Sequence, residues 1–268
     1  MTKKFITIKI SFILLFAICY LLSAAFPAFA QLDLPSFLNP FQQQTKSAMP
    51  AIDSSDLSLV WTTNTYTPPD YQGKALPAYG SVVEVSVIPN KSIKTGLASL
   101  VYNWYLDGQF KDSQSGKNRQ KFTFRVSALG GQQHLAKLKL TTEDGQELFS
   151  LSSAINIVTP QIVLYPAETQ TINFINAGAS QTDMSPGQEK TFVALPYFFN
   201  ISAPDALTYQ WSFERQTINK IQDKNKFSVK VSSGELAESF SRQLSLLVFN
   251  PANEIQRATG LMTITIKK

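Results

Sequence analysis

Cysteine and histidine are almost absent from this chain, and their scarcity excludes several kinds of chemistry. Among 268 residues there is one cysteine, Cys19, and one histidine, His134. Cys19 lies in an apolar run near the N-terminus, so the rest of the chain has no disulfide and no thiolate metal ligand. Because a zinc site needs three or four His or Cys ligands, we expect no metal and no cofactor.

Recognisable catalytic motifs are also missing. The sequence has no G-x-S-x-G nucleophile motif and no acidic loop with calcium-binding spacing. His134 follows a Gly-Gly-Gln-Gln turn, and we interpret it as a surface-loop residue rather than a general base. Two carboxylates that meet only in the folded chain would suffice for a glycosidase, so a hydrolase stays an open alternative. The expectation is nevertheless that the protein is not an enzyme.

The chain has little excess charge of either sign. Charged residues make up 16% of it, and the formal net charge is +5. Three lysines lie within the first ten residues, and without them 21 basic residues face 19 acidic ones, which leaves +2. Nucleic-acid binding calls for Lys and Arg clustered on one face. We therefore expect no nucleic-acid partner.

The first thirty residues have the three parts of a secretory signal peptide. A basic start precedes an apolar run from Ile10 to Ala25, and Ala28-Phe29-Ala30 closes it. This pattern predicts a signal peptide over residues 1–30, cleaved after Ala30, and a secreted, periplasmic or cell-surface protein. The alternative is an uncleaved anchor, because 10–29 is about long enough to cross a ~30 Å hydrocarbon core. Membrane contact is expected only through this leader.

Residues 31–56 are predicted to be a flexible linker. Three prolines and a glutamine run interrupt the segment, and no apolar periodicity is sustained in it.

Beyond residue 56, apolar and polar side chains alternate, which is the pattern of strands that bury one face. Val83, Val85 and Val87 alternate with Glu84 and Ser86. The same alternation occurs at 122–126, 136–140, 227–231 and 262–266. Short strands separated by turn residues at short intervals predict an all-β sandwich or barrel.

An internal repeat indicates two domains. Shifting the chain against itself by 107 residues aligns Gly80 with Gly187, Pro89 with Pro196, Leu100 with Leu207, Tyr102 with Tyr209, and Trp104 with Trp211. Small insertions change the offset further along, which loops tolerate because closure entropy grows slowly with length. We predict two tandem β-sandwich domains, at 57–159 and 160–268, with almost no slack between them.

A Tyr-x-Trp segment lies at the centre of each copy, and Tyr102, Trp104, Tyr209 and Trp211 are the predicted structural core. A Trp on a central strand of a two-sheet sandwich resembles the immunoglobulin-like superfamily. Residues 102–108 (YNWYLDG), with the strands predicted at 122–126 and 138–141, more narrowly resemble the PKD-type domains of bacterial exported surface proteins. Glu214 and Arg215 replace the Asp-Gly turn in the second copy, so the PKD resemblance is looser there.

Aromatic residues near the start of the first copy are the candidate contact site. Tyr66 and Tyr71 flank a Pro-Pro corner that has no counterpart in the second copy, and Trp61 lies shortly before them. Such a stiff aromatic loop is suited to stacking on a sugar or on a partner protein. The alternative is a loop folded back on the sandwich. For the apolar segment 195–199 we expect burial between the domains rather than contact with another protein.

These features favour a structural or adhesive module of the cell envelope. It would bind another protein or a surface component through its tandem domains. The first alternative is a carbohydrate-binding module in which Trp61, Tyr66 and Tyr71 form the platform for a cell-wall or extracellular glycan. The second is the hydrolase with a concealed carboxylate pair. The expected partner is thus a protein or glycan of the envelope.

Overall fold

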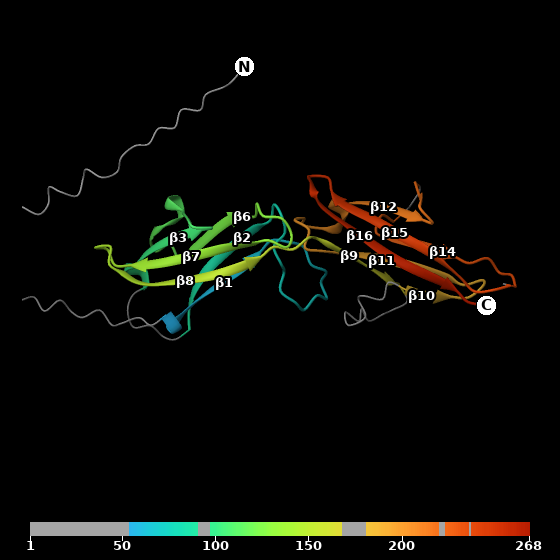
Figure 1. The fold of residues 1–268 in the computed structure, drawn as a ribbon, viewed down its shortest axis with the longest axis horizontal. Helices are drawn as coiled ribbons and strands as arrows, with labels where there is room; N and C mark the ends of the chain where they lie inside the picture. The colour runs from blue at the N-terminus through green and yellow to red at the C-terminus, as the bar shows by residue number, and fades with distance from the viewer. Residues whose placement is uncertain (1–53, 91–96, 168–180, 220–222, 236) are drawn as a thin grey trace, which may run out of the picture. The chain divides into compact units, whose positions relative to one another are not determined.

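The computed structural model describes residues 54–90, 97–167, 181–219, 223–235 and 237–268 (Figure 1). The predicted signal peptide, residues 1–30, and the predicted linker up to residue 53 lie outside these described residues. The linker's last residues, Ser54–Asp56, form a short 3₁₀ turn, η1. All described residues belong to one compact unit.

The first half of this unit forms two antiparallel sheets. One has the order β1-β2-β6, and the other has the order β4-β3-β7-β8 with β5 also paired to β3. The strands are β1 (Leu57–Thr63), β2 (Val82–Pro89), β3 (Val101–Leu106), β4 (Gln109–Phe110), β5 (Gly116–Lys117), β6 (Lys121–Arg125), β7 (Gln133–Thr141) and β8 (Glu147–Asn156). We call this pair of sheets sandwich 1.

The second half repeats the arrangement as sandwich 2. Its sheets have the orders β14-β11-β9 and β10-β16-β15-β12-β13. The strands are β9 (Gln161–Pro166), β10 (Gln181–Met184), β11 (Glu189–Tyr197), β12 (Thr208–Phe213), β13 (Gln216–Thr217), β14 (Lys226–Lys230), β15 (Phe240–Asn250) and β16 (Asn253–Ile266). Strand β10 runs parallel to β16, and a single parallel bridge between Ala78 and Val158 stands at the matching place in sandwich 1.

This strand order is that of an immunoglobulin-like sandwich. In sandwich 1, one sheet contains β1, β2 and β6, and the other contains β3, β7 and β8. The corresponding strands of sandwich 2 are β9, β11 and β14 in one sheet and β12, β15 and β16 in the other. The prediction of an all-β, tandem immunoglobulin-like protein is confirmed. Besides strands, the described residues contain 3₁₀ turns at Leu97–Ser99, Asp112–Gln114 and Pro204–Ala206, and none of their helices is long and apolar enough to span a membrane.

Equivalent tryptophans lie at the centres of the two hydrophobic cores. Both indoles are 0% exposed, and each stacks on an aromatic ring of the opposite sheet, Trp104 on Phe122 and Trp211 on Phe227, with centroids 5.4 Å apart in both cases. Each indole Nε1–H also donates to a loop carbonyl, that of Arg119 at 2.8 Å and that of Lys224 at 2.9 Å. Burying an indole removes roughly 200 Å² from water, so these two residues contribute much of the folding free energy in a disulfide-free domain.

Turns outside the cores are repeated as well. The residue after β3 and the residue after β12, Asp107 and Glu214, both have positive φ, at 51° and 49°. In each case the carboxylate accepts a hydrogen bond from a backbone N–H of the neighbouring strand. Asp107 accepts from Leu135 on β7 at 2.8 Å, and Glu214 accepts from Gln243 on β15 at 2.7 Å. The duplication therefore extends to loop geometry and is not limited to the buried pattern.

Candidate functional site

Sandwich 1 and sandwich 2 are joined by a cluster of side-chain amides. The centre of this cluster is Gln256 on β16, which is 0% exposed. Its Nε2 donates to the Tyr79 carbonyl of sandwich 1 at 2.7 Å. Its Oε1 accepts from the Asn200 backbone N–H at 2.9 Å and from Asn250 Nδ2 at 3.1 Å. One buried amide thus fixes a loop and the end of β15 in sandwich 2 and one loop of sandwich 1.

Asn200 makes a second set of bonds across the same junction. Its Nδ2 donates to the Gly80 carbonyl at 3.1 Å, and its Oδ1 accepts from Asn64 Nδ2 at 3.1 Å. The Gly80 carbonyl also accepts from the Arg125 guanidinium at 2.7 Å. We call Asn64, Asn200, Asn250, Asn253 and Gln256 the junction amides.

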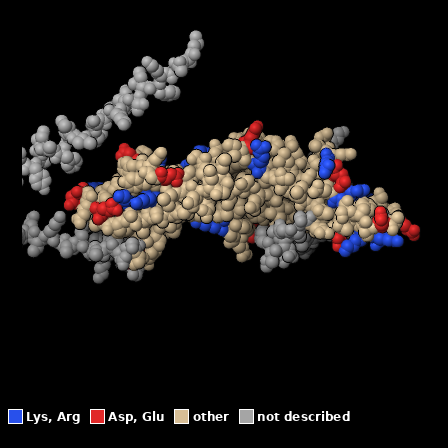
Figure 2. Space-filling view, in the orientation of Figure 1, with Lys and Arg blue, Asp and Glu red and all other residues tan. Residues whose placement is uncertain are grey.

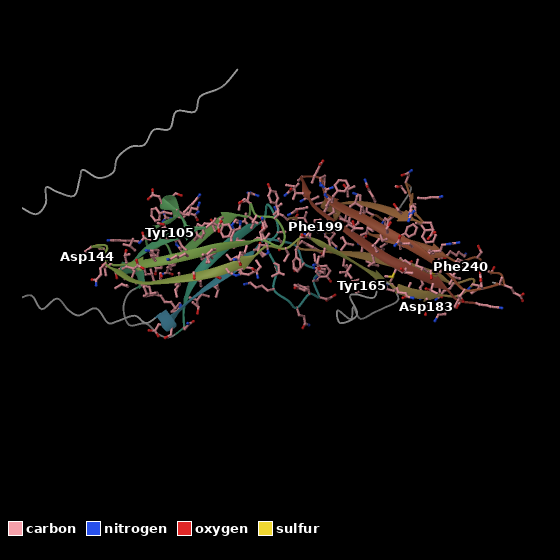
Figure 3. The ribbon with its side chains drawn as sticks, in the orientation of Figure 1. Tyr105, Asp144, Tyr165, Asp183, Phe199 and Phe240 are labelled. Atoms are coloured by element: carbon pink, nitrogen blue, oxygen red, sulfur yellow. The ribbon has the colours of Figure 1, made fainter. Side chains whose placement is uncertain are left out.

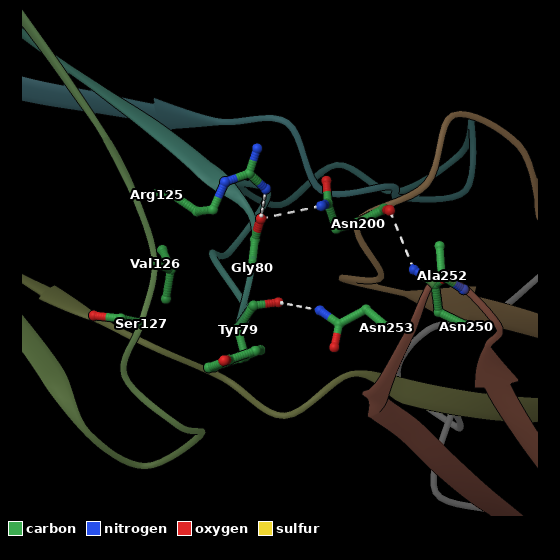
Figure 4. A pocket seen from close by; sticks show the side chains of 9 residues that line it. All are labelled: Tyr79, Gly80, Arg125, Val126, Ser127, Asn200, Asn250, Ala252 and Asn253. Atoms are coloured by element: carbon green, nitrogen blue, oxygen red, sulfur yellow. Dashed lines mark hydrogen bonds between the residues drawn. The ribbon is translucent and has the colours of Figure 1, made fainter.

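A pocket of about 570 Å³ lies beside the junction amides (Figure 4). Its lining combines three Asn side chains, one Arg and one Tyr with small residues: Tyr79, Gly80, Arg125, Val126, Ser127, Asn200, Asn250, Ala252 and Asn253. No carboxylate is in that lining. The pocket therefore does not supply the pair of acids that the hydrolase alternative requires.

The two candidate tyrosines both lie at this junction. The Tyr66 backbone exchanges hydrogen bonds with sandwich 2, because its N–H donates to the Phe199 carbonyl and its carbonyl accepts from the Phe198 N–H, both at 2.7 Å. The half-buried Tyr71 ring meets Tyr197 and Phe198 edge-on, with centroids 5.6 and 5.8 Å away. The loop is thus folded against sandwich 2, whereas the alternative interpretation expected it to fold back on its own sandwich.

The apolar segment 195–199 lies under this loop. Tyr197, Phe198 and Phe199 are buried, and Phe199 is labelled in Figure 3. The hydroxyls of Tyr165 and Tyr197 are buried without a hydrogen-bond partner in the described structure. Burial raises the pKa of Tyr197 well above its usual value, and the neighbouring Tyr165 adds to the shift. Tyr197 and Phe198 are therefore buried where the loop of sandwich 1 meets sandwich 2, as expected, whereas Phe199 belongs to the hydrophobic core of sandwich 2.

The remaining candidate, Trp61, lies on β1 and is half-buried against the core of sandwich 1. The ammonium of Lys74 sits 3.1 Å from the centroid of its ring, in a cation–π contact. Burial lowers the pKa of Lys74. The described ring contacts of Tyr71 are thus with Tyr197 and Phe198, whereas the described ring contact of Trp61 is with Lys74.

The four predicted core residues differ in burial. Tyr102, Trp104 and Trp211 are fully buried, and Tyr209 is half-buried at the edge of the second core. Both tyrosine hydroxyls donate to a carbonyl five residues earlier, at 2.9 Å for Leu97 and 3.3 Å for Pro204. Burial raises the pKa of Tyr209 to about 12, with Tyr66 and Asp205 adding to the effect.

His134 is not a surface-loop residue, and the sequence interpretation was wrong on this point. It lies on β7, is 5% exposed, and holds Asp107 Oδ2 at 2.6 Å through Nδ1. Its Nε2 accepts from the backbone N–H groups of Ser127 and Ala128 at 3.4 and 3.3 Å. This network assigns the ring proton to Nδ1. His134 therefore anchors a turn, and both of its nitrogens are already used.

Charged side chains do not gather into one field. On the face that Figure 2 shows, basic and acidic groups are scattered among a mostly uncharged surface. Several are paired, as Lys121 is with Glu84 and Lys267 with Asp183. Within the described ranges, no three His, Cys, Asp or Glu side chains come together as a metal site would require.

Comparisons with known proteins give similarity in solved structures only. No protein-family model and no curated protein sequence matches the chain. Among solved structures, the fibronectin(III)-like modules of Clostridium thermocellum CbhA share 12% identity at TM-score 0.24 and cover 78% of this chain and 93% of that one. Sidekick-1 immunoglobulin domains 1–4 share 10% at TM-score 0.27, covering 78% and 66%. The SGBP-B of the Bacteroides ovatus mixed-linkage glucan utilization locus, in complex with a heptasaccharide, shares 13% at TM-score 0.21, covering 78% and 47%. The fold assignment therefore rests on this chain's own strand order, which is that of two tandem immunoglobulin-like sandwiches.

Proposed function

We propose that this protein is an exported structural or adhesive module of the cell envelope, which binds a protein or another surface component. The observation that carries the proposal is the network of junction amides, which joins sandwich 1 to sandwich 2 through side chains. Between β8 and β9 there are only four residues, 157–160. A short connection and a bonded junction favour a pair of sandwiches that presents its surfaces at a fixed spacing.

The chemistry of the described residues supports binding rather than catalysis. His134 serves Asp107 and two backbone groups, and the junction pocket has no acid in its lining. A general acid–base mechanism needs a titratable group free to face a substrate. We propose that the protein is not an enzyme and uses no cofactor or metal.

Export is supported by the leader sequence. The basic start, the apolar run and the small residues before Gln31 direct the chain out of the cytoplasm. Cleavage after Ala30 would release the linker and both sandwiches as the functional protein.

A cell-binding assay tests this function. Full-length chain expressed in its own cells should appear in the extracytoplasmic fraction, with N-terminal sequencing starting at Gln31. Purified, fluorescently labelled 31–268 should bind intact cells saturably and be displaced by unlabelled protein. Retention of the full-length chain in the cytosol, or cell binding that neither saturates nor is displaced, would refute the proposal.

Glycan binding is the second candidate function, because aromatic rings remain at the surface of the described residues. In this hypothesis, Trp61, Tyr66 and Tyr71 form the platform. Tyr71 already contacts sandwich 2 and Lys74 covers Trp61, so binding there requires these contacts to open. Glycan-array binding that Tyr71→Ala abolishes would support this platform, and binding unchanged by that substitution would exclude it.

A further inference from the structure

One row of side chains on the outer face of sandwich 1 has the composition of a binding site. The row crosses four strands: Phe110 on β4 pairs with Tyr105 on β3, Tyr105 pairs with Lys137 on β7, and Lys137 pairs with Ser152 on β8. The Tyr105 and Phe110 rings have centroids 5.4 Å apart at an interplanar angle of 51°. Phe110 is 47% exposed, and Tyr105 is labelled in Figure 3.

The equivalent row of sandwich 2 shows whether the fold itself requires these side chains. The equivalent row, read through the same strand pairings, is Thr217 on β13, Ser212 on β12, Ser245 on β15 and Leu261 on β16. Small hydroxyl side chains thus stand where sandwich 1 has two aromatic rings and a lysine. The fold does not need Tyr105, Phe110 or Lys137 at these positions.

Nor does burial explain the Phe110 side chain, although Tyr105 is half-buried. A Phe that is nearly half exposed gains little from the hydrophobic effect, and exposed aromatic rings are enriched where proteins contact ligands or partners. Beyond the rings, this face continues over Leu135, Lys137 and Lys139 on β7, of which Leu135 is 44% exposed, to Ser150 and Ser152 on β8. Two rings cover far less than the roughly 800 Å² per partner of a stable protein interface. Their size fits a few sugar units better.

The charge of the side chains in the row indicates the sign of the ligand's charge. The neighbouring Lys139 is neutralised by Glu147, at 3.0 Å, whose carboxylate raises the pKa of that lysine. Lys137 makes no ion pair with any residue in the described part of the chain. Lys137 is opposite Tyr105 in the strand register, and its unpaired positive charge favours a ligand group of negative charge in this row.

We propose that the row Phe110, Tyr105 and Lys137 binds a carboxylated polysaccharide, with sugar rings against the aromatic faces and a uronic carboxylate at the ammonium. This proposal rests on the proposed binding function and names its ligand class. The site lies on a sheet face of sandwich 1, away from the junction loop that holds Tyr66 and Tyr71.

Substitutions copied from sandwich 2 test the site without disturbing the fold. Tyr105→Ser, Phe110→Thr and Lys137→Ser place the residues of the second row into the first, and Leu261→Thr on sandwich 2 is the matched control. Affinity electrophoresis uses polygalacturonate and alginate as probes and a neutral mixed-linkage glucan for comparison. Circular dichroism melting curves check that each variant folds.

The native protein should bind the acidic polymers and not the neutral one. Tyr105→Ser and Phe110→Thr should each weaken binding by about tenfold, the size expected for a lost ring contact. Lys137→Ser should remove most of the salt dependence, and Leu261→Thr should change nothing. The proposal would be overturned if the three row variants bound the acidic polymers as tightly as the native protein does. It would also be overturned if the native protein preferred the neutral glucan or did not bind the acidic polymers.

The cell-binding assay separates this failure from failure of the proposed function. A variant that carries Tyr105→Ser, Phe110→Thr and Lys137→Ser together is tested in the same assay. If it still binds cells as the native protein does, the row is not the contact site, and a different surface, such as one for a protein partner, carries the function. If neither cells nor acidic polymers bind the native protein, both proposals fail.

Discussion

Removing the amide at the centre of the junction should destabilise the described unit in a measurable way. The substitution Gln256→Ala deletes three hydrogen bonds, one to the Tyr79 carbonyl of sandwich 1 and two that hold Asn200 and Asn250. Each bond contributes about 0.5–1.5 kcal/mol net, and each buried partner left unsatisfied adds to the loss. We expect the free energy of unfolding to fall by about 3 kcal/mol.

Differential scanning calorimetry measures this loss. A change of 1 kcal/mol shifts Tm by about 2–4 °C in a protein of 150–250 residues, so Gln256→Ala should lower Tm by about 6–12 °C. Gln243→Ala is the matched control, because Gln243 is an exposed glutamine on β15 and its side chain is not part of the junction. A Tm within about 1 °C of the native value for Gln256→Ala would refute the reasoning.

Further predictions concern the cores, the His134 turn and the aromatic loop. Trp104→Ala and Trp211→Ala should each cost about 3–5 kcal/mol in urea unfolding, and a loss below about 1 kcal/mol for either would contradict its central place in a core. Burial raises the pKa of Asp107, but the Leu135 N–H and His134 outweigh it and lower that pKa below its usual 3.8. The stability that ionised Asp107 contributes is therefore present above pH 3.8 and is lost as the pH falls through its lower folded pKa. Asp107→Asn should consequently flatten the acid unfolding curve below about pH 4. An unchanged curve would contradict a stabilising contact between Asp107 and His134. Tyr71→Ala removes two edge-on ring contacts and should cost about 1–3 kcal/mol, measured by thermal melting with Tyr105→Ser for comparison.

The sequence was sufficient for the fold because the relevant signals are local. Alternation of apolar residues predicts the strand faces, and a gapless offset of 107 residues matches Trp104 to Trp211. Both are buried in equivalent cores, and each stacks on a phenylalanine of the opposite sheet, Trp104 on Phe122 and Trp211 on Phe227. The domain boundaries at 57–159 and 160–268, the leader and the PKD resemblance stay predictions.

The error at His134 had a signal that could have prevented it. Ala136, Leu138 and Leu140 face the core, and stepping back by two residues places His134 on the same inward phase of β7. The Gly-Gly turn before it obscured where the strand begins. Its partner Asp107 is 27 residues away, and nothing in the local sequence pairs them.

The junction could not be predicted from sequence, because its contacts join distant residues from different domains. Tyr71 meets Tyr197, and Gln256 bonds to Tyr79, across more than a hundred residues in each case. Such pairings depend on how two sandwiches pack, which periodicity does not describe. The outer row of Phe110, Tyr105 and Lys137 was missed for a related reason. Strand alternation places all three outside, but only the strand pairing aligns them.

The central claim is that the junction amides hold sandwich 1 and sandwich 2 as one binding body. Residual dipolar couplings of backbone amides, measured on weakly aligned 31–268, test it most directly. A single alignment tensor should fit the couplings of both sandwiches in the native protein, and separate tensors should be needed for Gln256→Ala. Two tensors of different magnitude in the native protein would show that the sandwiches reorient independently, and would contradict the claim.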